Sequence, residues 1–327
     1  MIGYYAHHQG AGHVTRATTI AAALNEPVVV LSSRHRPAHS DIDWVTLPLD
    51  VDDHHSYPDS AAGGIAHWAP LGVNGLTDRM AMIAAWIAAT RPRLFVVDVS
   101  AEIALFVRLM GVPVVVMAMP GERTDEPHRL AYRAATHILA PWSQTVYDPA
   151  WLHDHSGKTD YVGAISRFDG RARRSSGDAP DVLVLGGAGG TSLTAERIAD
   201  AAAADARYRW KAVGLDEASW VDDVWPLLCS AGVVITHAGQ NAVADVACAT
   251  ARAVVVPQHR PYGEQDATAQ SLARSRVAVV VPEWPEARRW PALVRAALES
   301  DPGAWRQVRQ SGAAARAADV LTRVARS

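Results

Sequence analysis

Cysteine is scarce in this 327-residue chain, which contains only Cys229 and Cys248. Both lie in Ala- and Val-rich segments that we expect to be buried, so a disulfide framework is not predicted and a reducing cytoplasm suits the chain. No apolar run reaches the roughly 18 residues that a membrane-spanning helix needs. The first residues also lack the basic region and long apolar run of a signal peptide. Any membrane contact is therefore expected to be peripheral, at the inner face.

A basic excess is absent too, because the formal net charge is -3 and the pI is about 6.5. Nucleic-acid-binding proteins usually carry a marked basic excess, so no nucleic-acid partner is predicted. Hydrophobic residues make up 49% and charged residues 20% of the chain, the usual mixture of a globular protein. The length is sufficient for two domains, each with its own core.

Short Val- and Ile-rich segments alternate with Ala-rich segments, which is typical of parallel strands joined by crossover helices. The first series predicts strands near residues 2–5, 27–31, 44–47, 94–97, 112–117 and 137–139, and helices at 15–24, 76–90, 101–110 and 126–135. The second predicts strands after residue 181 and at 210–213, 232–236, 253–257 and 278–281, with helices at 194–204, 224–229, 241–249 and 265–273. Residues 304–324 are expected to form a final helix that could pack back across the junction.

The segment between the two series is rich in Gly, Ser and charged residues, which is typical of a linker. We therefore predict an N-terminal Rossmann-like domain at 1–165, a linker at 166–180 and a C-terminal Rossmann-like domain at 181–327. Residues 50–75 show no helical or strand period and are interpreted as a long functional loop. This loop is rich in His, but the usual zinc spacings are absent, so no metal site is predicted.

A glycine-containing turn, Gln9-Gly-Ala-Gly-His-Val-Thr-Arg16, follows the first strand and opens a helix. In that position, backbone N–H groups and the positive helix end can approach an anion or a sugar oxygen. The third glycine of a dinucleotide fingerprint is absent, which disfavours a redox enzyme. His13 lies at the carboxyl edge of the predicted sheet and could accept a proton from a hydroxyl, or it could cap the helix or bond the loop backbone. His7 and His8 are interpreted as structural.

Asp98 ends the predicted strand at 94–97 and points toward the same edge. Its carboxylate could orient His13 or bind an acceptor hydroxyl. The alternative is that Asp98 caps the helix that starts near Ala101.

The second half repeats this arrangement with different residues. Gly186-Gly-Ala-Gly-Gly-Thr-Ser192 joins a strand to a helix but lacks the Lys-Ser/Thr ending of a P-loop, which disfavours NTPase chemistry. Thr236-His-Ala-Gly leads into a helix that carries Asp245, and a later loop brings Glu264 and Gln265 to the same sheet edge. A carboxylate suits ribose hydroxyls and a Glu–Gln pair suits sugar hydroxyls, whereas the alternative is a set of caps and surface polar residues.

With these motifs in view, the chain resembles the GT-B glycosyltransferases related to the enzyme that adds N-acetylglucosamine to the peptidoglycan lipid intermediate, a family 28-like group. The likeness spans nearly the whole chain and is strongest from residue 181 to 273. The resemblance implies an α/β protein of two Rossmann-like domains, whose parallel sheets face each other across a cleft. It assigns the acceptor to the first domain and the nucleotide sugar to the second.

The resemblance also implies roles for single residues. Asp245 would bind the ribose and Val221 the base edge, while Glu264 and Gln265 would contact the donor sugar. The diphosphate would lie at Gly187, Gly189, His237, Ala238 and Gly239. His13 and Asp98 would be catalytic, with Gly10, Gly12 and Arg16 on the acceptor side. Relatives commonly have Glu in place of Asp245, and some have Arg in place of His237.

The implied function is transfer of a sugar from a nucleotide-diphosphate sugar, expected to be a UDP-sugar, to a hydroxyl acceptor. Inversion at the anomeric carbon and independence of metal are expected, and the nucleotide sugar is a co-substrate, so no cofactor is predicted. The acceptor, a small molecule or a lipid-linked glycan, and the oligomeric state are not predicted. A nucleotide-sugar hydrolase or 2-epimerase on the same fold, or a non-catalytic sugar-nucleotide-binding subunit, remains an alternative.

Overall fold

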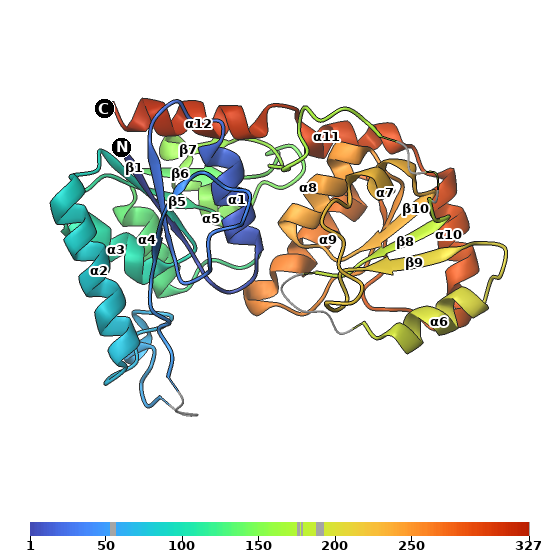
Figure 1. Cartoon of the computed structure of the whole chain (residues 1–327), viewed down its shortest axis with the longest axis horizontal. Helices are drawn as coiled ribbons and strands as arrows, with labels where there is room; N and C mark the ends of the chain where they lie inside the picture. Colours follow the sequence, from blue (N-terminus) through green and yellow to red (C-terminus); the bar gives the residue numbers. More distant parts are fainter. Residues whose placement is uncertain (53–56, 175–176, 178, 188–192, 327) are drawn as a thin grey trace.

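The computed structural model describes residues 1–52, 57–174, 177, 179–187 and 193–326. Two α/β halves, each built on a parallel sheet, lie side by side (Figure 1). Among the described residues, no helix is both long and apolar enough to cross a bilayer. The domain limits 1–165, 166–180 and 181–327 stay a prediction.

The first sheet has seven strands in the order β3-β2-β1-β4-β5-β6-β7. They are β1 (Ile2–Ala6), β2 (Val28–Ser32), β3 (Asp43–Thr46), β4 (Leu94–Asp98), β5 (Val114–Met117), β6 (His137–Ala140) and β7 (Thr159–Tyr161). The helices of this half are α1 (Gly12–Ala21), α2 (Asn74–Thr90), α3 (Ala101–Leu109), α4 (Glu126–Ala134) and α5 (Ala150–His153), with 3-10 turns at Ala62–Gly64 and Ser156–Lys158.

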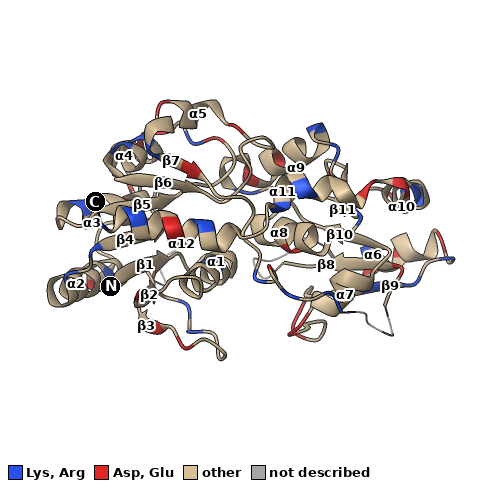
Figure 2. Ribbon diagram, turned by 90° about the horizontal axis from the view of Figure 1, so that it is seen from above, with Lys and Arg blue, Asp and Glu red and all other residues tan. Residues whose placement is uncertain are grey.

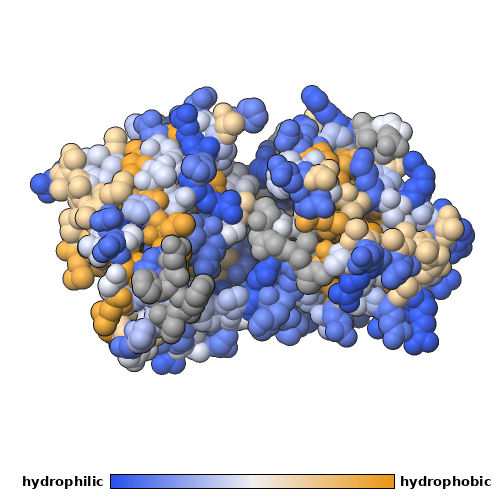
Figure 3. All heavy atoms as spheres, turned by 60° about the horizontal axis from the view of Figure 1, so that its bottom comes forward, coloured by the Kyte–Doolittle hydropathy of each residue, from blue (hydrophilic) through white to orange (hydrophobic). Residues whose placement is uncertain are grey.

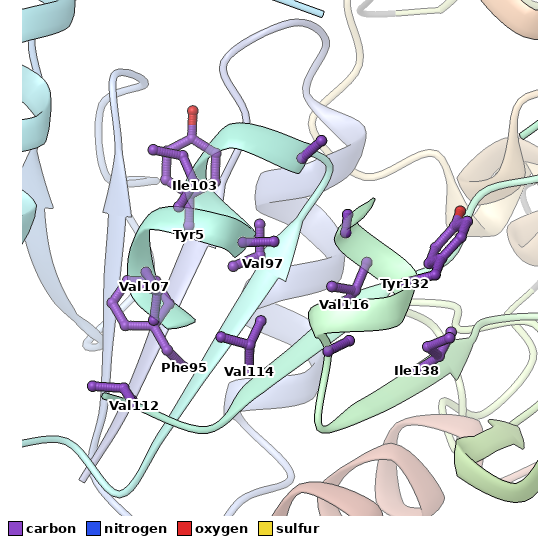
Figure 4. Packing of buried hydrophobic residues seen from close by; sticks show 14 of the residues in the cluster. Tyr5, Phe95, Val97, Ile103, Val107, Val112, Val114, Val116, Tyr132 and Ile138 are labelled. Atoms are coloured by element: carbon purple, nitrogen blue, oxygen red, sulfur yellow. The ribbon is translucent and has the colours of Figure 1, made fainter. Parts of the chain in front are cut away.

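The central strands of this sheet are buried on both faces, because helices cover each side. In β1 the side chains alternate, so that Tyr5 joins the core under α2, α3 and α4, while Ile2 and Tyr4 join the core under α1. Figure 4 shows the first core, where Phe95 and Val97 of β4 pack with Ile103 and Val107 of α3.

The second sheet has five strands in the order β12-β11-β10-β8-β9. They are β8 (Val182–Leu185), β9 (Trp210–Val213), β10 (Val233–Thr236), β11 (Ala253–Val255) and β12 (Val279–Val280). The helices are α6 (Ala195–Ala203), α7 (Trp225–Ser230), α8 (Gln240–Ala249), α9 (Glu264–Arg274), α10 (Trp290–Glu299), α11 (Arg306–Arg309) and α12 (Ala313–Val324), with 3-10 turns at Pro261–Gly263, Ala287–Arg289 and Pro302–Trp305.

The prediction of one final helix at 304–324 is wrong. The chain leaves helical geometry at Gln310 and Gly312, whose φ values are +39° and +84°, and this break separates α11 from α12. Beyond it, α12 returns to the first half and buries Ala317 and Leu321 against Ile20 of α1. Figures 1 and 2 both show α12 alongside α1.

Three short or irregular elements were not predicted: α5, β7 and α10. The strand β7 has the sequence Thr-Asp-Tyr and is only partly buried, so it carries no apolar run. The helix α10 begins with Trp290 and Pro291, and proline is more typical of turns than of helices. Proline suits this position because the first turn of a helix does not use its N–H groups internally.

Each sheet contains one point where the strand order reverses, and the loops on the two sides of such a point diverge and leave a crevice. In the first sheet this point lies between β1 and β4, and in the second it lies between β8 and β10. The turns singled out from the sequence follow these four strands. The fold therefore brings residues near 10–16 to Asp98, and residues 186–187 to residues 237–239.

Candidate active site between the two sheets

A cleft of about 1150 Å³ separates the halves and is lined from both of them. Figure 3 shows the hollow between the two lobes of the molecule. All the predicted site residues that the structure describes line this cleft, except Asp98, which lies behind its wall, and Ala238, which is fully buried. Gly189 lies outside the described residues.

His13 and Asp98 form the central pair of the first half. Gly10 has a φ of +80°, which lets the chain turn sharply from β1 into α1 and places His13 in the first turn of that helix. Its Nδ1 lies 2.8 Å from Oδ1 of Asp98, which is fully buried at the end of β4. The alternative that Asp98 caps a helix is wrong, because the Ser100 hydroxyl accepts the hydrogen bond from Ile103 N–H at the start of α3.

Asp98 is held by three further donors. Tyr4 donates its hydroxyl to Oδ2 at 3.0 Å, and Arg16 donates Nε to Oδ2 at 2.8 Å and a terminal nitrogen to Oδ1 at 2.5 Å. Burial alone would raise the pKa of Asp98, but the charges of Arg16 and His13 outweigh burial and hold this pKa well below its usual value. The ionised carboxylate favours the tautomer of His13 with a proton on Nδ1, so that Nε2 can accept a proton.

The acceptor-side role that the resemblance implies for Arg16 stays a prediction, although this residue lines the cleft. Its side chain is only 3% exposed, and besides Asp98 it donates to Oε1 of Gln240 at 2.7 Å. Gln240 is the first residue of α8, so this hydrogen bond crosses from the first half to the second. Arg16 therefore supports the His13–Asp98 pair from behind and links it to the other sheet.

The turn between β10 and α8 is built mainly from backbone. Gly239 precedes α8 and has no side chain to cap it, so the first backbone N–H groups of that helix lack an intrahelical partner, and residues 239–242 line the cleft. Burial lowers the pKa of the neighbouring His237, and its Nδ1 donates to the Val256 carbonyl at 3.2 Å. The backbone N–H groups at the start of α8 can therefore attract an anion at this turn.

Asp245 lies one turn further along α8 and is 7% exposed. The Ser166 hydroxyl donates to Oδ1 at 2.7 Å, and Nε of Arg167 lies 3.3 Å from Oδ2. Burial raises the pKa of Asp245 to about 6, although Arg167 and Ser166 act against this shift. Ser166 and Arg167 were predicted only as linker residues, because Ser and Arg in a glycine-containing segment resemble exposed chain.

Comparison with known proteins agrees with this geometry. Residues 183–300 match the glycosyltransferase family 28 C-terminal domain. Three solved structures share the fold, each with 15% sequence identity to this chain. The glycotransferase of kitacinnamycin has a TM-score of 0.70 and covers 99% of this chain and 98% of its own. MurG of Acinetobacter baumannii has a TM-score of 0.62 and covers 98% of this chain and 99% of its own, and LpCGTa in complex with UDP has a TM-score of 0.69 and covers 99% of this chain and 98% of its own. No curated protein sequence matches. The chain has the GT-B fold of these structures, and residues 183–300 carry the family 28 C-terminal domain.

The remaining residues that were predicted to bind the donor lie along the second sheet. Gly187 follows β8, and Val221 lines the cleft beside Trp220, which is 54% exposed. Glu264 begins α9 and lies 3.8 Å from Arg123 of the first half. Gln265 is buried and accepts a hydrogen bond from Gln258 N–H at 2.9 Å, so its side-chain oxygen holds its own loop.

The first half of the chain contributes a wall of His and aromatic residues to the cleft. The rings of His7 and His8 stack with centroids 4.5 Å apart, and burial lowers the pKa of His7 to about 3, so this imidazole is neutral. His67 and Trp68 bring the loop at 50–75 into the same wall. The interpretation of residues 50–75 as a functional loop stays a prediction, and His54 and His55 lie outside the described residues.

Two groups in this wall have the ligand types of a metal site: His7, His8 and Asp50, and His67, Asp125 and His128. In the second group, both imidazoles contact the Asp125 carboxylate. Arg123 lies 3.3 Å from Nε2 of His128, and burial together with this cation lowers the pKa of His128 to about 4. A fixed guanidinium at that distance opposes the binding of a second cation.

Proposed function

We propose that this enzyme transfers a sugar from a nucleotide-diphosphate sugar to a hydroxyl group, inverts the anomeric centre and needs no metal ion. The observation that carries the proposal is the buried His13–Asp98 pair, which stands at one switch point and faces the uncapped start of α8 at the other. The UDP in the complex of the structural relative LpCGTa supports a nucleotide donor, and we expect UDP-sugars to be used.

In the proposed reaction, Nε2 of His13 takes the proton of the acceptor hydroxyl while the oxygen attacks the anomeric carbon. The bond from that carbon to the diphosphate oxygen breaks, and the diphosphate leaves with the electron pair. Attack from the face opposite the leaving group inverts the centre. The N–H groups at the start of α8 would stabilise the negative charge that the diphosphate gains, which is the role that a divalent ion has in other enzymes.

The donor half supplies the rest of the proposed binding site. Asp245 would accept hydrogen bonds from ribose hydroxyls, and the main chain at Val221 would contact the base. Gly187, Ala238 and Gly239 let the diphosphate approach the backbone, while Glu264 and the amide nitrogen of Gln265 would contact the sugar. Gly10 and Gly12 would lie on the acceptor side with the wall that contains His7, His8 and Trp68.

The test is a panel of UDP- and dTDP-sugars incubated with the protein without an acceptor, with thermal stabilisation and free nucleotide as the two measurements. Stabilisation by one donor with negligible nucleotide release, followed by release when a hydroxyl acceptor is added, is the expected result. Rapid release without an acceptor would identify a hydrolase or an epimerase instead. Binding without turnover across a broad acceptor panel would identify a non-catalytic subunit.

A further inference from the structure

The first two residues of α8 reach across the cleft to the helix that carries His13. Nδ2 of Asn241 donates to the carbonyl of Gly12 at 2.9 Å. Oε1 of Gln240 accepts from Arg16 at 2.7 Å. Neither residue was predicted as part of the site, and their side chains contact the first half although their backbone belongs to the donor half.

These contacts fall on both sides of His13. Gly12 directly precedes His13, and Arg16 follows it by about one helical turn. Arg16 also binds both oxygens of Asp98, the carboxylate that orients His13. A shift of α8 away from α1 would therefore release the His13 backbone on one side and the support of Asp98 on the other.

We propose that Gln240 and Asn241 are positioning residues, which hold His13 against Asp98 only while the two sheets are close together. The inference rests on the transferase function proposed above. The backbone N–H groups of the same helical turn face the proposed diphosphate site. One turn of helix thus contacts the donor through its backbone and the proton acceptor through its side chains, which couples the two substrates.

A second contact holds the halves together without reaching α1. Glu122 N–H donates to the Tyr262 carbonyl at 2.8 Å, and the Arg123 guanidinium lies 4.6 Å from the centre of the Tyr262 ring. Gly121 is needed there because a Cβ atom would lie 2.3 Å from the same carbonyl. The contacts at Tyr262 therefore help to hold the two halves together, and the side chains of Gln240 and Asn241 are available to align His13.

The experiment uses two variants of nearly unchanged size, Gln240→Met, which removes the acceptor for Arg16, and Asn241→Leu, which removes the donor to Gly12. Each is expected to lower kcat by roughly tenfold, because catalytic groups lose efficiency when they are misaligned. The dissociation constant for the nucleotide should change by less than about twofold. Gln310→Ala is the matched control, because it removes another hydrogen bond between the halves, to Ser143 at 3.0 Å, from residues that do not line the cleft. It should leave kcat unchanged.

A double-mutant cycle with His13→Ala separates positioning from other roles. If Gln240 and Asn241 act through His13, Gln240→Met and Asn241→Leu should not lower kcat any further in the His13→Ala variant. A further tenfold loss in that background, or a loss of nucleotide affinity as large as the loss in kcat, would overturn the inference. If His13→Ala is slow but both α8 variants are as fast as the unsubstituted enzyme, only the positioning role fails. If His13→Ala is itself as fast as the unsubstituted enzyme, the proposed function fails as well.

Discussion

The two turns that face each other across the cleft share a geometry and differ in charge. Each joins a strand at a switch point to a helix that begins without a side-chain cap. Beside α1 stands a buried ion pair, Asp98 with Arg16, whereas beside α8 stand Gly186 and Gly187, which carry no charge. Asp98 at the end of β4 can therefore orient a proton acceptor in the first turn, whereas no charged residue directly follows β8.

The largest effect is expected from Asp98→Asn, which keeps the shape of the side chain but removes its charge. Arg16 would remain buried without its carboxylate, so the free energy of unfolding should fall by about 3 to 5 kcal/mol. Transfer should slow by at least about a hundredfold, because His13 loses the group that fixes its tautomer. Urea unfolding and initial rates measure the two changes. A stable variant with a normal rate would remove Asp98 from the mechanism.

His13→Ala should slow transfer by roughly a hundredfold or more, without a matching loss of stability or of donor affinity. The reason is that the imidazole lines the cleft and is 14% exposed, so its removal leaves no buried charge unpaired. Single-turnover rates measure the loss in transfer rate, and nucleotide titrations test whether donor affinity is unchanged. A normal rate would make His13 a structural residue.

On the donor side, Asp245→Ala should weaken nucleotide binding by about 1 to 3 kcal/mol, the usual cost of losing a charge-assisted hydrogen bond. The rate at saturating donor should change much less than the affinity. Calorimetric titration with the nucleotide measures the change, and His13→Ala is the matched control because its affinity should be normal. Unchanged affinity of the Asp245 variant would refute the ribose contact.

Asp245→Asn should have the opposite effect on stability from Asp98→Asn. The folded-state pKa of Asp245 is about 6, above its ordinary value of 3.8, so the folded protein binds more protons between these two pH values. The contribution of this group to stability therefore falls as pH rises through that window and is most unfavourable above about pH 6. Asn should raise the free energy of unfolding by about 1 kcal/mol at pH 8. This gain is smaller than the pKa shift alone implies, because the substitution also removes the contact with Arg167.

The measurement is unfolding of the ligand-free protein at several pH values. The gain should shrink on acidification and disappear below about pH 4, where both states of the unsubstituted protein are protonated at this residue. A gain that is constant with pH would trace to packing rather than to charge.

The smallest expected effect is that of a chelator. If the start of α8 supplies the attraction for the leaving diphosphate, removal of divalent ions should leave the transfer rate unchanged within about twofold. Rates with EDTA and after addition of Mg²⁺ or Mn²⁺ check this. Activity that disappears with the chelator and returns with one ion would contradict the metal-independent mechanism, and the group of His67, Asp125 and His128 would be the first place to substitute.

The sequence predicted most strands and helices, because their apolar runs are continuous and alternate with Ala-rich segments. The switch points depend on the strand order, which the sequence alone does not give. His13 and Asp98 could be found because His13 follows the glycine turn after β1 and Asp98 ends the buried strand β4. The hydrogen bond between Arg16 and Gln240 could not be predicted, because the two residues are 224 positions apart and both are ordinary polar residues on helices. Ser166 and Arg167 were hidden by the composition of the linker, and the break after α11 depends on Gln310, which is not a usual helix-ending residue.

The return of α12 to the first sheet has a consequence for the order of folding during synthesis. Ala317 and Leu321 cover the same core as Ile2, Tyr4 and Ile20, yet they leave the ribosome after every strand of the second sheet. One face of the first sheet therefore stays incompletely covered while the second half is being made. The nascent N-terminal half must wait for the α12 segment, or depend on a chaperone, before its core is complete.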